Sequence, residues 1–295
     1  MLRRSVARCA AGSALAKQIQ ELRYKTDAPI LQCKKALGEC DGDIEKAIAW
    51  LRAKGAADSV KKEGRETAFG TLGVCVAKPG AATRSDLATP AAIIELGAET
   101  DFAVRNEKFA AFANELCGSM AEVIGQEEHA GRSDAELLEI LQTRSTDAKK
   151  ALIAALGENV VLKRVWAMPA PEAGLAPRYA DDGVAQPTRF VLGSYVHNSS
   201  AAAPLVGNII GLAGCWSYKA DGALERADVD DFAQHLVSHL GDKSDVAGQA
   251  FLGSDQTVSK WCKERACRLR AGFVYKYGME APQLVVPKPI EAPKV

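Results

Sequence analysis

The sequence lacks the motifs that mark the common catalytic classes. Its 295 residues contain no GxxxxGK[ST] phosphate-binding loop, no GxSxG nucleophile motif and no HExxH zinc motif. No set of residues suggests a nucleophile, a base and an oxyanion hole in one place, so an enzyme with covalent chemistry is disfavoured. We therefore expect no cofactor and no metal site.

The sequence also lacks an excess of one charge, long apolar runs and paired cysteines. Lys and Arg together number 37, as do Asp and Glu, so the formal net charge is zero. This balance argues against binding nucleic acid over the whole surface. No apolar run reaches the length of a membrane span. None of the eight cysteines forms a CxxC pair, which is typical of reduced thiols in an intracellular compartment.

The N-terminus has a distinctive composition. Four basic residues and no acid precede Glu21, and alanine and serine fill much of the space between them. This pattern resembles a mitochondrial presequence, which we expect at residues 1–15. An ordinary basic N-terminus is the alternative.

Hydrophobic periodicity predicts a small helical bundle at residues 16–56, joined to the rest by a linker at residues 57–69. So small a bundle is marginal on its own. The last of its helices is expected to stop at Gly55, because glycine commonly follows a helix. The three helices are expected at residues 16–25, 30–40 and 44–54.

The remainder repeats one order of elements, namely strands, then helices, then a strand. This predicts two related core subdomains at residues 70–167 and 189–280. A proline-rich linker at 168–188 separates them, and 281–295 is expected to be a disordered tail. The expected fold class is α+β, with a three-helix ubiquitin-associated-like bundle before the two subdomains. Strands are expected at 71–78, 91–98, 160–167, 190–197, 205–212 and 273–277, and helices at 102–126, 134–156 and 229–240.

An acid beside a large aromatic marks the corner between a predicted strand and a predicted helix. Residues 99–102 read Glu-Thr-Asp-Phe. Asp101 suits a helix start, whereas Phe102 would ordinarily prefer a core. If Phe102 points outward, it is suited to enter a partner. An ordinary cap followed by one core phenylalanine is the alternative.

Two further features carry weaker signals. His235 and His239 are four residues apart on a predicted helix, a spacing that could seat a metal, but no third ligand lies nearby in the sequence. A contact with a partner or a partly buried histidine are the other interpretations. Residues 260–276 hold six basic residues and one acid beside three aromatics. RNA contact is conceivable there, although a solvated helix face is the commoner explanation.

A series of motifs in a fixed order resembles the elongation factor Ts family, and together they span about residues 16–280. The first consists of Leu-Arg-Tyr-Lys-Thr at 22–26, Cys-Lys-Lys-Ala-Leu at 33–37 and the run at 42–52. The others are Glu-Thr-Asp-Phe at 99–102 with Arg105 and Phe109, Gly-Glu-Asn-Val at 157–160, Gly-Ser-Tyr-Val-His at 193–197, Gln-His at 234–235 and Gln-Thr-Val at 256–258. The basic N-terminus points to the mitochondrial members of this family.

The resemblance implies a guanine nucleotide exchange factor for the translational GTPase elongation factor Tu, located in the mitochondrial matrix. It implies that Asp101 disturbs the network that holds the partner's magnesium ion and that Phe102 wedges between helices of the GTPase. By the same resemblance, His235 helps to shift the partner's phosphate-binding loop. The partner-binding residues it implies are Ile30, Leu31 and Thr100.

The chain departs from the family pattern in several places. Ala103 stands where valine is usual, and the loops at 79–90 and 168–188 look longer than usual. Too few residues separate His235 from Phe251 for the helical hairpin that bacterial members insert. Two alternatives therefore remain. One is a degenerate exchange-factor homologue that serves as a structural subunit or assembly factor on mitochondrial ribosomal particles, and the other is a ubiquitin-associated binding module on an unrelated body.

Overall fold

The computed structural model describes residues 2–26, 28–77, 90–168, 189–219, 224–242 and 244–285. The predicted loop 79–90 and linker 168–188 lie almost wholly outside these residues. The described chain is α+β and divides into two compact units. Unit 1 comprises Met1–Phe69, Ala98–Ala103 and Ser145–Val161, and unit 2 comprises Gly70–Gly97, Val104–Arg144 and Leu162–Val295.

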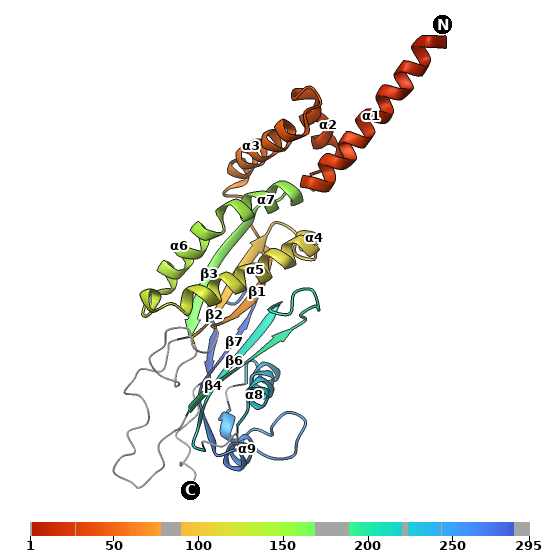
Figure 1. The fold of residues 1–295 in the computed structure, drawn as a ribbon. Coiled ribbons are helices and arrows are strands. Elements are labelled where there is room, and N and C mark those ends of the chain that lie inside the picture. Colours follow the sequence, from red (N-terminus) through yellow and green to blue (C-terminus); the bar gives the residue numbers. More distant parts are fainter. Residues whose placement is uncertain are drawn as a thin grey trace. The chain divides into compact units, whose positions relative to one another are not determined.

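Unit 1 begins with three helices that pack around a small apolar core (Figure 1). They are α1 (Leu2–Thr26), α2 (Ile30–Glu39) and α3 (Ile44–Lys62). The first helix was expected to begin at residue 16, but its backbone is helical from Leu2, through the predicted presequence. This stretch is rich in alanine, the best helix former, and contains no proline to interrupt it. The core is formed by Leu22, Cys33, Ala36, Leu37, Ala47 and Leu51.

The prediction that α3 stops at Gly55 is wrong, because the helix continues to Lys62. A Cβ atom on Gly55 would lie 2.9 Å from the Cβ of Ala154 in α7 (Thr146–Leu156). Glycine therefore serves here to let two helices of unit 1 approach closely, rather than to end one of them. Gly64, with φ of +87°, follows the end of α3 instead. The predicted linker is thus helical over its first half.

The first sheet of unit 2 has the strand order β3-β2-β1-β5. Its strands are β1 (Phe69–Val76), β2 (Ala91–Ala98), β3 (Val160–Met168) and the short β5 (Val206–Gly207). The helix expected at 102–126 is split into α4 (Asp101–Val104) and α5 (Glu107–Ile124), because Asn106 caps α5 by accepting a hydrogen bond from the Lys108 N–H at 2.9 Å. The helix expected at 134–156 is likewise split at Ser145 into α6 (Asp134–Arg144) and α7.

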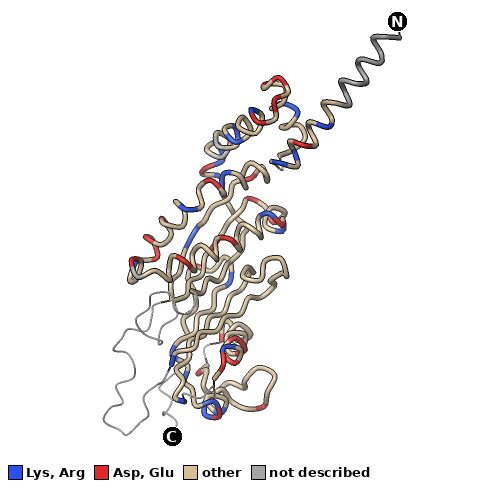
Figure 2. The backbone as a smooth tube through the Cα atoms, in the orientation of Figure 1, with Lys and Arg blue, Asp and Glu red and all other residues tan. Residues whose placement is uncertain are grey.

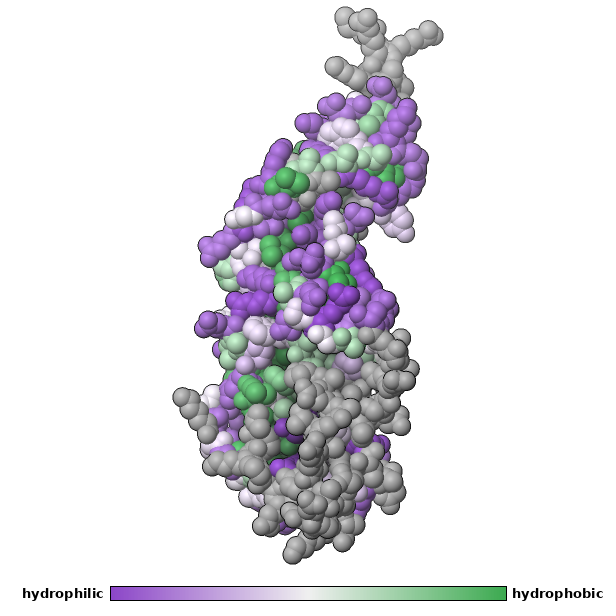
Figure 3. All heavy atoms as spheres, turned by 90° about the vertical axis from the view of Figure 1, so that its left-hand side faces the viewer, coloured by the Kyte–Doolittle hydropathy of each residue, from purple (hydrophilic) through white to green (hydrophobic). Residues whose placement is uncertain are grey.

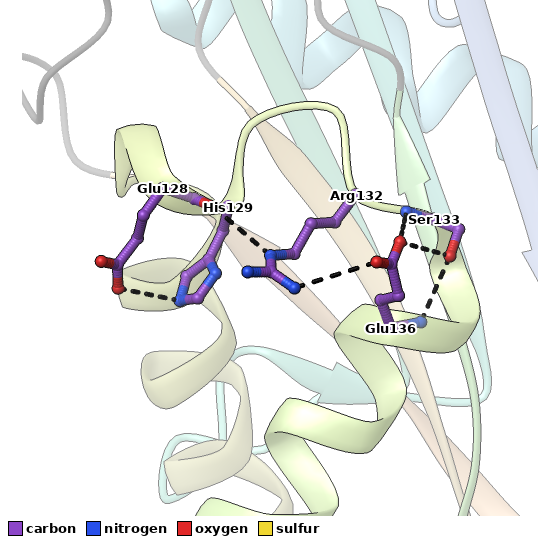
Figure 4. A network of polar contacts seen from close by, with 5 residues as sticks. All are labelled: Glu128, His129, Arg132, Ser133 and Glu136. Carbon is purple, nitrogen blue, oxygen red and sulfur yellow. Dashed lines mark hydrogen bonds and ion pairs between the residues drawn. The ribbon is translucent and has the colours of Figure 1, made fainter.

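A local polar network fixes the connection between α5 and α6 (Figure 4). Ser133 and Glu136 form a reciprocal cap, in which the Glu136 carboxylate accepts from the Ser133 N–H at 2.8 Å and the Ser133 hydroxyl accepts from the Glu136 N–H at 3.4 Å. The Arg132 guanidinium lies 3.9 Å from Glu136 and also donates to the Glu128 carbonyl, while His129 contacts the Glu128 carboxylate at 3.3 Å. These contacts set the start of α6 at Asp134, as predicted.

The second sheet of unit 2 is antiparallel, with the order β4-β6-β7-β8. Its strands are β4 (Arg189–His197), β6 (Ile209–Ser217), β7 (Cys267–Lys276) and β8 (Gln283–Val285), and it is accompanied by α8 (Arg226–Ser238), η2 (Val246–Gly248) and α9 (Val258–Glu264). The prediction of a disordered tail from residue 281 is corrected, because Gln283–Val285 pair with β7. Residues 286–295 lie outside the described part.

The two sheets share a strand order. In the first sheet, β2 lies between β1 and β3. In the second sheet, β6 lies between β4 and β7. The fourth strand differs, because β5 pairs with β1 in the first sheet and β8 pairs with β7 in the second. Between the sheets lies one apolar core, to which β1, β2, β4, β6 and β7 contribute. Most charged residues lie on helices, and the strands carry few (Figure 2).

One charged side chain is nevertheless buried in this unit. Glu95 in β2 accepts a hydrogen bond from the Tyr275 hydroxyl of β7, and the Arg164 guanidinium lies 3.9 Å from the same carboxylate. Burial and the neighbouring Glu95 raise the pKa of Tyr275 to about 12, so this phenol stays a donor at physiological pH. The hydrogen bond between Tyr275 and Glu95 joins the two sheets of unit 2. Among the residues that the structure describes, no helix is both long and apolar enough to span a membrane.

Candidate functional site

The corner after β2 presents Phe102 to solvent. The Thr100 hydroxyl accepts a hydrogen bond from the Ala103 N–H at 3.2 Å and so caps the single turn of α4. Phe102 is 81 % exposed, whereas Ala103 beside it is only 5 % exposed. The alternative of a core phenylalanine at this corner is therefore wrong. The inward position belongs to Ala103.

Phe102 is one of several large apolar side chains that are exposed among the described residues. On the face drawn in Figure 3, the described residues are mostly hydrophilic, and hydrophobic ones form small separate groups. The exposure of Phe102 makes its ring available to a partner.

Two glutamates hold the backbone of the corner. The Glu158 carboxylate accepts hydrogen bonds from the Thr100 N–H at 3.0 Å and from the Thr100 hydroxyl at 2.7 Å. In the opposite direction, the Glu99 carboxylate accepts from the Asn159 N–H at 2.6 Å. Hydrogen bonds to ionised groups are about twice as strong as neutral ones. The motifs at 99–102 and 157–160 therefore form one structural feature.

The same feature includes the segment that follows α3. The buried Asn159 side chain donates to the Arg65 carbonyl oxygen at 3.0 Å, and the Arg65 guanidinium lies 3.5 Å from the Glu99 carboxylate. Gly157 ends α7 in the left-handed region, with φ of +78°, where glycine carries no steric cost. We call Arg65, Glu99, Thr100, Glu158 and Asn159 the corner clamp.

A second group of exposed apolar residues lies on the N-terminal helices of unit 1. Ile30 and Leu31 are the first two residues of α2 and are 53 % and 80 % exposed. Both side chains are therefore accessible to a partner. Tyr24 near the end of α1 is 90 % exposed. Sequence reasoning assigned no role to Tyr24. The signal was available, since Tyr24 follows the buried Leu22 by two residues and so lies away from the bundle core.

His235, in contrast, is fully buried in unit 2. Its Nδ1 accepts from the Leu252 N–H at 3.3 Å, and its Nε2 therefore donates to the Gln249 side-chain oxygen at 3.1 Å. The ring stacks on Phe251, with a centroid distance of 5.3 Å. Burial, followed by the nearby His239, lowers the pKa of His235 to about 4, so the imidazole is neutral. Within the described residues, no group of three or more His, Cys, Asp or Glu side chains is placed to hold a metal ion.

The buried His235 predicts acid sensitivity. Its folded pKa, about 4, lies below its ordinary value of 6.5, so the unfolded chain binds the proton first. Its contribution to stability is therefore complete above about pH 6.5 and is lost as the pH falls toward 4. Between pH 7 and pH 5 we expect the free energy of unfolding to fall by about 2 kcal/mol from this group. Urea unfolding of wild type and His235→Leu at both pH values tests this, and an equal pH dependence in the two proteins contradicts it.

The basic segment at 260–276 does not combine its charges with available aromatic rings. Trp261 and Tyr275 are both buried. Arg265 lies over the Trp261 ring at 4.4 Å and forms an ion pair with Asp228 at 2.8 Å. Two of the three aromatic rings are thus unable to stack on bases, which weakens the prediction of RNA contact.

Together, the fold and the site define an α+β protein that presents apolar side chains on a corner held by hydrogen bonds and on a helical bundle. Comparison with known proteins identifies the family. The chain is 31 % identical over 275 residues to elongation factor Ts 1, mitochondrial, of Trypanosoma cruzi (strain CL Brener), covering 90 % of this chain and 88 % of that protein. It is 31 % identical over 296 residues to elongation factor Ts, mitochondrial, of Leishmania major, covering 98 % and 99 %.

A bacterial relative matches a shorter stretch. Elongation factor Ts of Nitratidesulfovibrio vulgaris (strain DP4) is 37 % identical over 191 residues, covering 65 % of this chain and 53 % of that protein. No protein-family model matches the chain. The extent of the first two similarities shows that the chain belongs to the elongation factor Ts family, which confirms the resemblance found in the sequence.

Proposed function

We propose that this protein is the guanine nucleotide exchange factor of mitochondrial elongation factor Tu. It binds the GDP-bound GTPase, weakens its hold on GDP and leaves it ready for GTP, without covalent chemistry. The observation that carries this proposal is the exposed Phe102 on a clamped corner in a chain of the elongation factor Ts family. The mitochondrial names of the relatives and the basic N-terminus support the matrix as its location.

Exchange requires only that the factor bind the nucleotide-free GTPase more tightly than the nucleotide-bound form. This difference is a coupling free energy, and GDP must weaken binding of the factor by the same ratio. Each 1.4 kcal/mol of coupling changes the affinity for nucleotide about tenfold. The coupling comes from contacts that the factor makes only with the nucleotide-free GTPase. A corner that is already ordered before binding makes such contacts at a lower entropic cost.

The roles proposed for the corner residues come from the family resemblance, and the exposure of Phe102 supports its role. Phe102 enters between helices of the GTPase, and Asp101, at the start of α4, disturbs the partner's magnesium network. Magnesium is often the largest local charge in a nucleotide site, so disturbing the groups that hold it strongly lowers the affinity for the nucleotide. The Thr100 hydroxyl is engaged within this chain, so its part in partner binding is to support Asp101 and Phe102.

The remaining contacts come from other parts of the chain. Ile30 and Leu31 on a ubiquitin-associated-like bundle grip the GTPase, which their exposure supports. His235 acts on the phosphate-binding loop of the partner indirectly, through the segment at Gln249–Leu252 to which its imidazole is hydrogen-bonded. Its imidazole holds the backbone of Leu252, and the Leu252 side chain is 40 % exposed.

Release of a fluorescent GDP analogue from mitochondrial elongation factor Tu tests the proposal. We expect wild type to accelerate release strongly and the double variant Asp101→Ala/Phe102→Ala to lose this acceleration, because both side chains would act on the nucleotide site. Failure of folded wild type to accelerate release contradicts the proposal. Salt-resistant co-sedimentation with mitochondrial ribosomal particles would then favour the structural role.

A further inference from the structure

The motif at 157–160 has no role in the exchange reaction as proposed so far. None of its side chains resembles a contact for a partner, since Asn159 is buried and the Glu158 carboxylate is occupied by Thr100. The structure nevertheless joins this motif to the corner that carries Phe102. Its contribution must therefore be sought in what it does to Thr100.

Neither a long helix nor packing of the Phe102 ring holds the corner. Helix α4 spans only Asp101–Val104, and a single helical turn is not stable by its own hydrogen bonds. Phe102 is exposed, so its ring gives the backbone no packing in the free protein. Within unit 1, the contacts at the start of α4 include the Thr100 cap, the small buried Ala103 and the two bonds to Glu158.

The clamp also joins the corner to the segment after α3. Asn159 contacts both Glu99 and the Arg65 carbonyl, so one buried amide side chain and its own backbone N–H tie three segments of unit 1 together. The hydrogen bonds of this network are partly buried and share members, so loss of one member should loosen the others. The Glu158 carboxylate is the member that accepts hydrogen bonds from both the N–H and the hydroxyl of Thr100.

We propose that Glu158 is a positioning residue for nucleotide exchange, which holds Thr100 so that Phe102 projects in the orientation its partner requires. This inference rests on the proposed function. Glu158 does not touch the GTPase. It acts by fixing the corner before binding, which reduces the cost of ordering it in the complex.

A double-mutant cycle with Phe102 separates positioning from a general loss of stability. We expect Glu158→Ala to slow nucleotide release about tenfold, the size of effect that loss of one charged hydrogen-bonding group produces. Glu158→Gln should recover part of this loss, because its amide oxygen still accepts a bond from Thr100. In the Phe102→Ala background, Glu158→Ala should have a clearly smaller further effect than in wild type, because only Asp101 is left to position. Losses that multiply would overturn the inference.

Two further measurements keep the outcomes distinct. Glu139→Ala, which removes an exposed carboxylate from α6, is the matched control and should leave release unchanged. Hydrogen exchange of the Thr100 amide should be slow in wild type and fast in Glu158→Ala, whereas equal protection would overturn the inference without reference to activity. If wild type does not accelerate release, the proposed function fails. If wild type does so and the losses multiply, only the positioning role of Glu158 fails.

Discussion

Replacing Phe102 with alanine is expected to slow nucleotide release from elongation factor Tu by about thirtyfold or more. Truncation of an aromatic anchor at the centre of an interface typically costs about 2 kcal/mol or more, and each 1.4 kcal/mol is tenfold. The ring is 81 % exposed in the free chain, so the substitution removes almost no packing within the protein. The melting temperature should therefore stay close to that of wild type, and stopped-flow release of a fluorescent GDP analogue measures the loss.

Lys263→Ala is the control for this substitution. Lys263 is an exposed residue of α9, in unit 2, and removal of one solvated charge usually has little effect. Equal losses of activity in the two variants would contradict the role assigned to Phe102.

Gly193→Ala is expected to have a large effect on stability. A Cβ atom at this position in β4 would overlap the backbone of Val229 and Asp230 in α8, well inside the 3.0 Å that real Cβ atoms keep. The helix cannot retreat freely, because the Ser194 N–H donates to the Asp230 carboxylate at 2.7 Å. We expect a loss of about 3 kcal/mol or more, which lowers the melting temperature by roughly 6–12 °C.

The matched control is Gly118→Ala. Gly118 lies in α5, also in unit 2, and a Cβ atom there meets nothing within 4 Å. Alanine is favoured over glycine in a helix by about 0.5–1 kcal/mol, so this variant should be slightly more stable than wild type. A melting temperature of Gly193→Ala within a degree or two of wild type would contradict the close packing of α8 on β4.

Much of the fold could be predicted from local signals. The strand at 91–98 and the helix that begins at Ile30 lie where the sequence placed them, because apolar runs and proline are local signals. Gly55 misled the prediction because its role depends on Ala154, about a hundred residues away. The short strand β8 was missed because three residues carry too little periodicity to be recognised.

In the candidate site, too, local features could be predicted from the sequence and contacts between distant segments could not. An exposed phenylalanine beside an acid could be suspected from the sequence, since the residue types are unusual for a corner. That Glu158 would bond Thr100, 58 residues earlier, could not, because hydrogen bonds between distant segments leave no periodic pattern. The burial of His235 also depends on a distant segment, at Gln249–Leu252.

The burial of the cysteines allows local opening of each apolar core to be measured by the reaction of its thiols with an alkylating reagent. Among the cysteine side chains that the structure describes, Cys40 is half-buried and the other six are buried, with one in the helical bundle and the rest in the two sheet regions. Burial raises the pKa of Cys33 and of Cys75, and thiol neighbours do most to raise that of Cys262. Neutral, buried thiols do not react with alkylating reagents until the structure opens. Alkylation rates read by mass spectrometry would therefore report separately how often the bundle and each sheet region open in the native protein.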